Sequence, residues 1–311
     1  MNGFTFEPAK WIPFRDKAIL EKVRRIGMGD ITKHPNPDFR IHLVKDDELE
    51  FIWIADMFHR IKTAYDRDEK VVMILPNPAP VYKKVAYLIN RFKVNCSKVF
   101  TFNMDEWADE NCNIADENYP QGFLNSTLRF FYNEIDPKLR MPRENINAPT
   151  TKNIKYYSKL IQEAGGADIC YSGPGWTGHL AFIDPDVPEL QADSLEDWKK
   201  LGARVVTLNP ITIAQNSLHG SFGASGDMAN VPPKAATIGP ADVIAARNRI
   251  ELHGLTTSGT FVSWQRLVSK LVLHGPVTPS VPSSILQTLK TDVYVTETLA
   301  QEVEPIWDMQ Y

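Results

Sequence analysis

Two kinds of apolar pattern alternate along this chain. Apolar residues recur at near-helical spacing between residues 47 and 65, which predicts an amphipathic helix. The positions that carry this spacing are Leu49, Ile52, Trp53, Phe58 and Ile61. Residues 71–75 then form an uninterrupted Val-Val-Met-Ile-Leu run, which is typical of a parallel strand covered on both faces.

The same alternation continues along the chain and predicts the fold class. Helices are predicted at 16–26, 47–65, 81–92, 121–134, 151–164 and 259–273. Strands are predicted at 71–75, 97–103, 167–171, 204–208, 235–238, 249–254 and 292–296. Strands that alternate with helices favour an α/β fold. We therefore expect a doubly wound, mostly parallel, Rossmann-like sheet in a three-layer α/β/α arrangement.

The N-terminal region differs from the rest of the chain. Residues 1–40 contain one helical stretch and prolines at positions 8, 13, 35 and 37. We expect this region to be an extension that packs on the core or on a partner subunit. Residues 41–311 are expected to form a single α/β domain.

Composition argues against several classes of protein. Of the 311 residues, 43% are hydrophobic and 23% are charged, and the net charge is −4, which does not fit a disordered chain. No basic cluster suits a nucleic acid, and no apolar stretch is long enough to span a bilayer. The N-terminus has no secretory pattern, and the three cysteines have no metal-binding spacing. We expect a cytoplasmic protein without nucleic-acid or membrane partners, and without a metal or nucleotide cofactor.

A glycine-rich turn carries the first candidate for chemistry. It follows the predicted strand 167–171 and reads Ser-Gly-Pro-Gly-Trp-Thr-Gly-His over residues 172–179. The glycines let the backbone turn sharply and approach a ligand closely. The turn places His179 at the carboxyl end of a strand, where α/β sheets bind ligands. The alternative is a structural histidine that bonds its own turn, but the position at a strand end favours a functional role.

A second candidate follows the predicted strand 97–103. After Met104 come Asp105, Glu106 and Trp107. The structural alternative for Asp105 is a helix N-cap, for which aspartate is well suited. The Asn-Met-Asp-Glu context favours a functional carboxylate.

These two segments resemble the signatures of the glucosamine-6-phosphate deaminase (isomerase) family, which shares its fold with 6-phosphogluconolactonases. The family patterns are Phe-Asn-Met-Asp-Glu-aromatic after a strand and Gly-x-Gly-x-x-Gly-His-x-Ala-Phe, matched by residues 102–107 and 173–182. Residues 207–217 and 231–239 are similar to two further family segments, so the resemblance extends from about residue 40 to the end. Lactonases usually carry arginine after Asp-Glu, so Trp107 favours the deaminase branch.

The resemblance implies an aldose–ketose isomerisation. In it, Asp105 is the base that moves a proton from C2 to C1, and His179 helps to open the sugar ring. Two nearby positions depart from the family, because Thr177 replaces an acidic residue and Asp184 replaces a glutamate. A hydroxyl orients an imidazole but does not stabilise its cation. We predict Asp105, His179, Asp184 and Thr177 as catalytic residues. The predicted substrate-binding residues are Asn77, Ala79, Glu106, Gly173, Gly175, Gly178, Arg204, Ser217 and Lys234.

The expected phosphate site departs more strongly from the family. A glycine-rich loop whose N–H groups hold phosphate is replaced here by Pro-Asn-Pro-Ala-Pro at residues 76–80. The family's arginine aligns with Leu218, or with His219 if the loop is shifted, and its lysine aligns near Val262. Because these three contacts are lost together, we expect a changed ligand. The alternative sources of positive charge are Arg204, Lys234 and Arg266.

Two other functions stay open at this point. A lactonase-type hydrolase would use His179 to activate water, but Trp107 in place of arginine disfavours it. A sugar-binding protein without catalysis is allowed by Thr177, but the retained Asp105 and His179 disfavour it. We expect the protein to be a homo-oligomer whose ligand is a small sugar or a sugar-derived molecule.

Overall fold

The computed structural model of the chain describes residues 3–77, 79–254 and 264–307. The strands within these ranges are β1 (Phe39–Val44), β2 (Val71–Leu75), β3 (Val99–Asn103), β4 (Asp105–Ala108), β5 (Ile146–Asn147), β6 (Ile169–Ser172), β7 (Arg204–Thr207), β8 (Lys234–Thr237), β9 (Asn248–His253) and β10 (Thr291–Thr296). The α-helices are α1 (Lys17–Arg24), α2 (Glu48–Asp66), α3 (Tyr82–Phe92), α4 (Phe123–Phe130), α5 (Tyr157–Glu163), α6 (Leu195–Trp198), α7 (Pro210–Asn216), α8 (Pro240–Ala245), α9 (Gln265–His274) and α10 (Glu297–Ala300). Short 3₁₀ helices are η1 (Tyr132–Glu134), η2 (Arg143–Asn145), η3 (Ile154–Tyr156), η4 (Pro188–Leu190), η5 (Gly220–Phe222), η6 (Met228–Asn230) and η7 (Pro282–Thr288).

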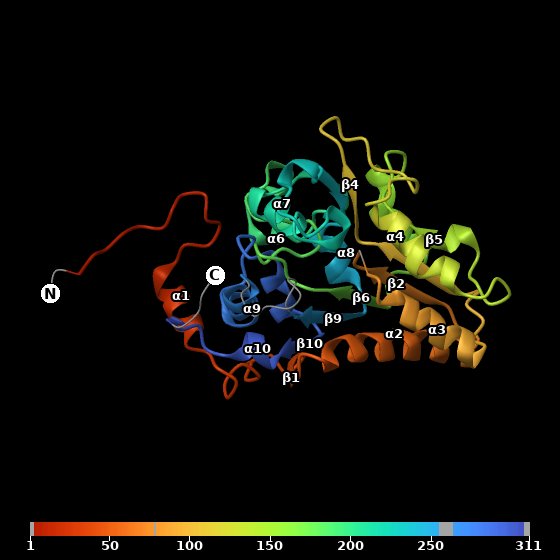
Figure 1. The fold of residues 1–311 in the computed structure, drawn as a ribbon, viewed down its shortest axis with the longest axis horizontal. Coiled ribbons are helices and arrows are strands. Elements are labelled where there is room, and N and C mark those ends of the chain that lie inside the picture. Colours follow the sequence, from red (N-terminus) through yellow and green to blue (C-terminus); the bar gives the residue numbers. More distant parts are fainter. Residues whose placement is uncertain (1–2, 78, 255–263, 308–311) are drawn as a thin grey trace.

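Two sheets organise the described part of the chain (Figure 1). The larger sheet has seven strands in the order β1-β10-β9-β6-β2-β3-β5, and its neighbours pair in parallel. The smaller sheet has three antiparallel strands in the order β4-β8-β7. The predicted doubly wound, mostly parallel α/β fold is therefore confirmed.

Helices cover both faces of the large sheet. All five residues of β2 are buried, as expected for a strand covered on both sides. On one face, Val72 and Ile74 belong to a core cluster that includes side chains of α1, α5 and α9. On the other face, Val71, Met73 and Leu75 belong to a cluster with side chains of α2 and α3. These clusters give the three layers, and Figure 1 shows α2 and α3 running along one side of the sheet.

The strand order reverses direction at β2, and this reversal positions the candidate site. From β2 the chain moves outward through β3 to β5, and it then returns to the other side of β2 as β6. Open α/β sheets bind ligands in the crevice at the carboxyl ends of strands where the order reverses. The turns after β2, β3 and β6 all lie at this edge.

Several predicted elements differ from the structure in detail. Strands 204–208 and 235–238 are present as β7 and β8, but they belong to the small antiparallel sheet, where β8 pairs with β7 and with β4, a strand that was not predicted. β1 was also not predicted; it pairs with β10 at the edge of the large sheet. The helix predicted at 259–273 is observed as α9, and residues 259–263 and Val262 lie outside the described residues.

Candidate active site

The glycine turn after β6 brings His179 to the carboxyl edge of the large sheet. Gly178 has a φ of +74°, a left-handed conformation that favours glycine. Gly173 passes close to β9, since a Cβ built there would lie 2.7 Å from the carbonyl oxygen of Leu252. A Cβ at Gly175 would lie 2.2 Å from Nε2 of His179. These glycines shape the turn around the imidazole, and their contact with a substrate stays a prediction.

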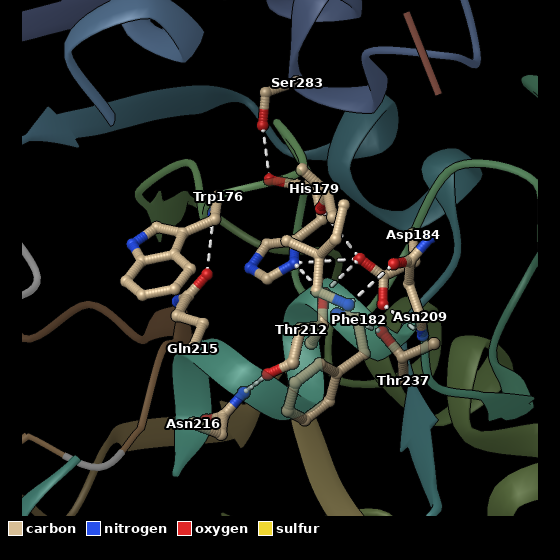
Figure 2. A network of polar contacts seen from close by, with 12 residues as sticks. Trp176, His179, Phe182, Asp184, Asn209, Thr212, Gln215, Asn216, Thr237 and Ser283 are labelled. Carbon is tan, nitrogen blue, oxygen red and sulfur yellow. Dashed lines mark hydrogen bonds and ion pairs between the residues drawn. The ribbon is translucent and has the colours of Figure 1, made fainter. Parts of the chain in front are cut away.

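Asp184 holds the imidazole of His179 at one nitrogen (Figure 2). Nδ1 of His179 lies 3.0 Å from Oδ1 of Asp184, and both residues are buried. A carboxylate at Nδ1 fixes the tautomer and orientation of an imidazole and leaves Nε2 as its proton acceptor. Nε2 is the atom that lies against Gly175.

Three other groups donate hydrogen bonds to Asp184. The hydroxyls of Thr177 and Thr212 donate to Oδ1 at 2.9 and 2.7 Å, and the N–H of Asn209 donates to Oδ2 at 3.1 Å. Thr177 therefore supports the imidazole through Asp184. Asn209 is the N-cap of α7, and Thr212 lies in its first turn. Sequence reasoning gave neither of these two residues a role, although the Asn-Pro pair at 209–210 marks a helix start.

Asp105 begins β4, two residues after the end of β3. Its side chain is buried, and Oδ1 has no hydrogen-bond partner among the described residues. Burial, and then the charge of Glu106, raises the pKa of Asp105 well above its ordinary value. Asp105 pairs in register with Thr237 of β8, whose hydroxyl accepts a hydrogen bond from the N–H of Phe182 at 3.2 Å. Thr237 thus links the two segments that carry Asp105 and His179.

Because Asp105 and His179 both directly follow apolar strands, the sequence predicts that they face one pocket at the carboxyl ends of neighbouring strands. The two strands, β3 and β6, are not neighbours in the sheet. β2 lies between β3 and β6, because the strand order reverses there. The aromatic rings of Trp107 and Phe182, one from each segment, are 5.1 Å apart. The segments are therefore in contact, and the expectation that Asp105 and His179 face one ligand stays a prediction.

Glu106 is fully buried and binds the start of α4. Its carboxylate accepts hydrogen bonds from the N–H groups of Trp107, Phe123 and Leu124 at 2.9, 2.9 and 2.7 Å. Burial nevertheless raises its pKa to about 7. These contacts give Glu106 a structural role, and its predicted contact with substrate stays untested.

The loop after β2 has few backbone donors for an anion. The carbonyl oxygens of Ala79 and Pro80 accept hydrogen bonds from the N–H groups of Tyr82 and Lys83, so the start of α3 uses these donors internally. Ala79 is buried, and Oδ1 of Asn77 lies 3.1 Å from the hydroxyl of Thr127. Pro78 lies outside the described residues.

The other predicted binding residues have intramolecular partners. Arg204 donates to the carbonyl oxygens of Gly202 and Glu189, and the hydroxyl of Ser217 donates to the carbonyl oxygen of Ala214. Nζ of Lys234 lies 3.3 Å from Sγ of Cys112, at the end of β8 opposite to Thr237. Arg266 donates to the carbonyl oxygen of Glu302. Substrate binding by any of them stays a prediction.

Two further side chains surround the turn. Oε1 of Gln215 accepts a hydrogen bond from the N–H of Trp176 at 2.7 Å and would meet a side chain at Gly175. Burial, and then the charge of His179, lowers the pKa of His219 to about 4. His219 is therefore neutral near pH 7 and supplies no positive charge in place of the family's arginine.

Two other kinds of feature are absent from the described ranges. No group of three or more His, Cys, Asp or Glu side chains there could hold a metal ion. No helix there is long and apolar enough to cross a membrane.

Comparison with known proteins identifies the family. The chain is 33% identical over 224 residues to a glucosamine-6-phosphate deaminase of Clostridium botulinum, covering 70% of this chain and 79% of the relative. A glucosamine-6-phosphate deaminase of Thermoanaerobacter pseudethanolicus is 27% identical over the same length, covering 70% and 76%. No family model matches the chain.

Solved structures show the same fold. A monomeric glucosamine-6-phosphate deaminase superposes with a TM-score of 0.65 at 19% identity, covering 84% of this chain and 98% of that one. A 6-phosphogluconolactonase from Leishmania guyanensis superposes with a TM-score of 0.59 at 12% identity, covering 85% and 98%. The chain belongs to the glucosamine-6-phosphate deaminase family and is an enzyme of this sugar isomerase and deaminase group.

Proposed function

We propose that the protein isomerises a sugar or amino sugar by acid–base catalysis, with or without loss of ammonia. The observation that carries the proposal is the buried pair of Asp184 and His179, which leaves Nε2 of the imidazole as a proton acceptor beside the glycine turn. Asp105, on the segment joined to this turn through Thr237, supplies the second proton-transfer group.

The first step is opening of the sugar ring. Nε2 of His179 takes the proton from the C1 hydroxyl and returns a proton to the ring oxygen as the C1–O bond breaks. The negative charge of Asp184 stabilises the imidazolium formed between these two transfers. Thr177, Thr212 and Asn209 hold that carboxylate in place.

The second step moves a proton from C2 to C1. Asp105 takes the C2 proton and returns it to C1 by way of an enediol or enolamine, while a proton passes from the oxygen or nitrogen on C2 to the oxygen on C1. A carboxylate whose pKa is raised by burial is a stronger base than an exposed one, which suits this transfer. With an amino group at C2, the product is an imine that water hydrolyses to a ketose and ammonia.

We further propose that the phosphate site is altered. The Pro-Asn-Pro-Ala-Pro loop has three residues without an N–H. Leu218 carries no charge, and His219 is neutral near pH 7. Hydrogen bonds to charged groups contribute about 1.5–3 kcal/mol each, so losing several weakens a phosphosugar by orders of magnitude. Glucosamine 6-phosphate is therefore expected to be a poor substrate.

The experiment compares phosphorylated and unphosphorylated sugars. Purified protein is assayed for ketose and ammonia with glucosamine 6-phosphate and glucosamine, with Asp105→Asn and His179→Asn as inactive controls. A catalytic efficiency on glucosamine 6-phosphate of about 10⁴ M⁻¹s⁻¹ or more would contradict the altered phosphate site. Hydrolysis of 6-phosphogluconolactone without any isomerisation would instead support the lactonase alternative.

A further inference from the structure

A cavity of about 620 Å³ lies between the N-terminal segment, α9, the glycine turn and the C-terminal segment. Figure 1 shows α1 beside α9. The walls of the cavity are mostly aliphatic and aromatic, with tryptophans at positions 11, 176 and 264. Small-molecule sites in proteins have volumes of roughly 300–1,000 Å³ and mostly apolar walls. The mechanism proposed above does not use this cavity.

The described walls of the cavity carry positive charge and no negative charge. Arg24 and Arg266 line it, whereas no aspartate or glutamate does so among the described residues. The other polar side chains with a place in the walls are Thr177 and Ser280, and the hydroxyl of Thr177 is bonded to Asp184. Guanidinium groups bind carboxylates strongly. The walls therefore suit a molecule that is apolar over most of its surface and carries one anionic group.

Arg24 and Arg266 meet the same short stretch of the C-terminal segment. The carbonyl oxygen of Arg24 accepts a hydrogen bond from the N–H of Val303 at 2.9 Å. The guanidinium group of Arg266 donates to the carbonyl oxygen of Glu302 at 3.1 Å. The two arginines are thus anchored at neighbouring residues, at the end of the cavity that Val303 lines.

Both guanidinium groups have donors for an incoming anion. Nε of Arg266 is buried and has no hydrogen-bond partner among the described residues. A buried donor without an acceptor lowers stability, so an acceptor atom from a ligand is favourable there. Nη1 of Arg24 lies 3.6 Å from Oε2 of Glu21, which is longer than a usual hydrogen bond. A carboxylate at this end of the cavity would give both groups an acceptor.

The cavity also borders the glycine turn that carries His179. Trp176 and Thr177 of the turn form part of its wall. The ring centroids of Trp176 and Trp264 are 4.7 Å apart, so the turn contacts the start of α9 inside this wall. Figure 2 shows Trp176 on the side of the imidazole opposite to Asp184. A molecule in the cavity would therefore touch the turn that positions the imidazole.

We propose that this cavity binds a free amphipathic carboxylate, with its apolar chain between the tryptophans and α9 and its carboxylate at Arg24 and Arg266. Four separate segments of the chain form the walls, which suits a free molecule that enters whole rather than a lipid held in a membrane. The occupant is chemically unlike a sugar, so the proposal does not depend on the proposed isomerase function.

Calorimetric titration of the full chain with octanoate and with 1-octanol tests the chemistry of the occupant. We expect octanoate to bind at least about tenfold more tightly, because only the acid forms charged hydrogen bonds with the arginines. From hexanoate to decanoate, the affinity should rise about fourfold per added methylene, since each methylene is buried. Octanol that binds as tightly as octanoate, or no binding by any of the acids, would overturn the proposal.

Arginine variants test where the carboxylate lies. Arg24→Met and Arg266→Met should each weaken octanoate about tenfold or more and leave the affinity for octanol unchanged. Lys22→Met is the matched control, because it removes the same charge from α1 at a residue that does not line the cavity. Equal weakening of octanoate by Lys22→Met would indicate a general attraction of anions and would contradict a carboxylate site at the two arginines.

Filling the cavity tests where the apolar chain lies. Leu267 lines the cavity from α9, and Leu267→Trp should weaken octanoate and octanol alike by at least about tenfold. Leu267→Met conserves volume and should bind both as the wild type does. Leu20→Trp fills the cavity from α1 and gives the same comparison if Leu267→Trp does not fold. Wild-type affinity in a folded variant of this kind would place the binding elsewhere and overturn the proposal.

Hydrogen exchange followed by mass spectrometry locates the bound molecule. Octanoate should slow exchange in residues 172–178 and 265–274 and leave residues 82–92, the internal reference, unchanged. Protection that is absent from both of the first two segments would contradict the proposal. The titration is also repeated at rising protein concentration. Loss of octanoate binding as chains associate would show that a second copy fills the cavity, and would likewise overturn the proposal.

Discussion

The missing side chain at Gly175 decides where the imidazole of His179 can lie. A Cβ at this position would be 2.2 Å from Nε2, 2.3 Å from Cε1 and 2.7 Å from Oε1 of Gln215. Gly175→Ala is therefore expected to push the ring away from its place beside Asp184. We predict a fall in kcat of about 100-fold or more, since general acid–base catalysis contributes 10²–10⁴-fold.

Gly220→Ala is the control for this substitution. A Cβ at Gly220 meets nothing within 4 Å, so activity and melting temperature should stay at wild-type values. Steady-state kinetics and thermal unfolding of both variants check the prediction. Full activity in Gly175→Ala would show that the imidazole does not need this position.

Thr177 provides a test of how Asp184 is held. Its hydroxyl donates to Asp184 rather than carrying the charge found at this position in the family. Thr177→Val removes the donor at nearly constant volume, and we expect kcat to fall about tenfold. Thr177→Ser keeps the donor and should retain most activity. Equal kcat values for the two variants would contradict a role for this hydrogen bond.

Some site residues could be predicted from sequence, and others could not. Asp105, His179 and Asp184 lie in short segments that directly follow strands or turns, so their positions in space follow from local pattern. Thr212 and Ser283 reach His179 from 33 and 104 residues further along the chain. Such contacts depend on tertiary packing, which hydrophobic periodicity does not contain.

At the scale of elements, Glu106 joins β4 to the start of α4. Phe123 and Leu124, the first residues of α4, donate to its carboxylate, and no side chain caps this helix at Gly122. Glu106→Ala would leave these buried N–H groups without an acceptor. An unsatisfied buried donor costs roughly 1–3 kcal/mol, so we expect the free energy of unfolding to fall by at least about 2 kcal/mol.

Urea unfolding measures this change, with Glu110→Ala as the control. Glu110 is exposed, and its removal should change stability by less than about 0.5 kcal/mol. A Glu106→Ala protein of wild-type stability with weakened sugar binding would instead favour the substrate contact expected from sequence.

The sequence pattern predicts a strand that is covered on both faces, but it does not predict the pairing of strands that are far apart along the chain. The continuous run of β2 identified a central strand, because only a strand covered on both faces is apolar throughout. β7 and β8 were predicted as strands, but the small antiparallel sheet that they form with β4 was not. The apolar pattern of a strand does not indicate which other strand it pairs with. β4 is four residues long and follows β3 after one residue, so no pattern separated it from β3.

At the scale of the whole molecule, the N-terminal segment is the best place to test the expected homo-oligomer. α1 packs in the core, whereas Phe4, Phe6 and Trp11 are 91%, 65% and 67% exposed. A cavity of about 620 Å³ lies between this segment and α9. Exposed apolar patches of this kind mark association surfaces. We predict that light scattering after gel filtration gives at least twice the mass of one chain.

Phe6→Ala with Trp11→Ala should reduce this mass to that of a monomer. Phe51→Ala is the control, because Phe51 is 70% exposed on α2, away from this segment. A wild-type protein that stays monomeric at tens of micromolar would refute the expected assembly, and an unchanged oligomer in the double variant would move its interface elsewhere.

Buried titratable groups are expected to lower the free energy of unfolding at both high and low pH. Burial raises the pKa of Glu251 to about 8 and that of Glu106 to about 7, from 4.5. The folded protein therefore keeps protons that the unfolded chain releases, and stability present below pH 4.5 is lost as pH rises towards 8. Burial lowers the pKa of His253 to about 3 from 6.5. Its contribution is present above pH 6.5 and is lost as pH falls towards 3.

The urea concentration at the midpoint of unfolding should therefore decrease as pH rises from 6.5 to 8. It should also decrease as pH drops below 4.5. Each proton held by the folded state alone changes the free energy of unfolding by about 1.4 kcal/mol per pH unit. Glu251→Gln removes one such proton and keeps an acceptor for the hydroxyl of Ser172. Between pH 6.5 and 8, its free energy of unfolding should therefore decrease less steeply than that of the wild type, by about 1.4 kcal/mol per pH unit. The slope m should stay constant across the series, which confirms that the same surface unfolds. Two results would show that Glu251 is ionised in the folded protein. One is a wild-type free energy of unfolding that rises steadily up to pH 8. The other is the same change of this free energy with pH in Glu251→Gln as in the wild type.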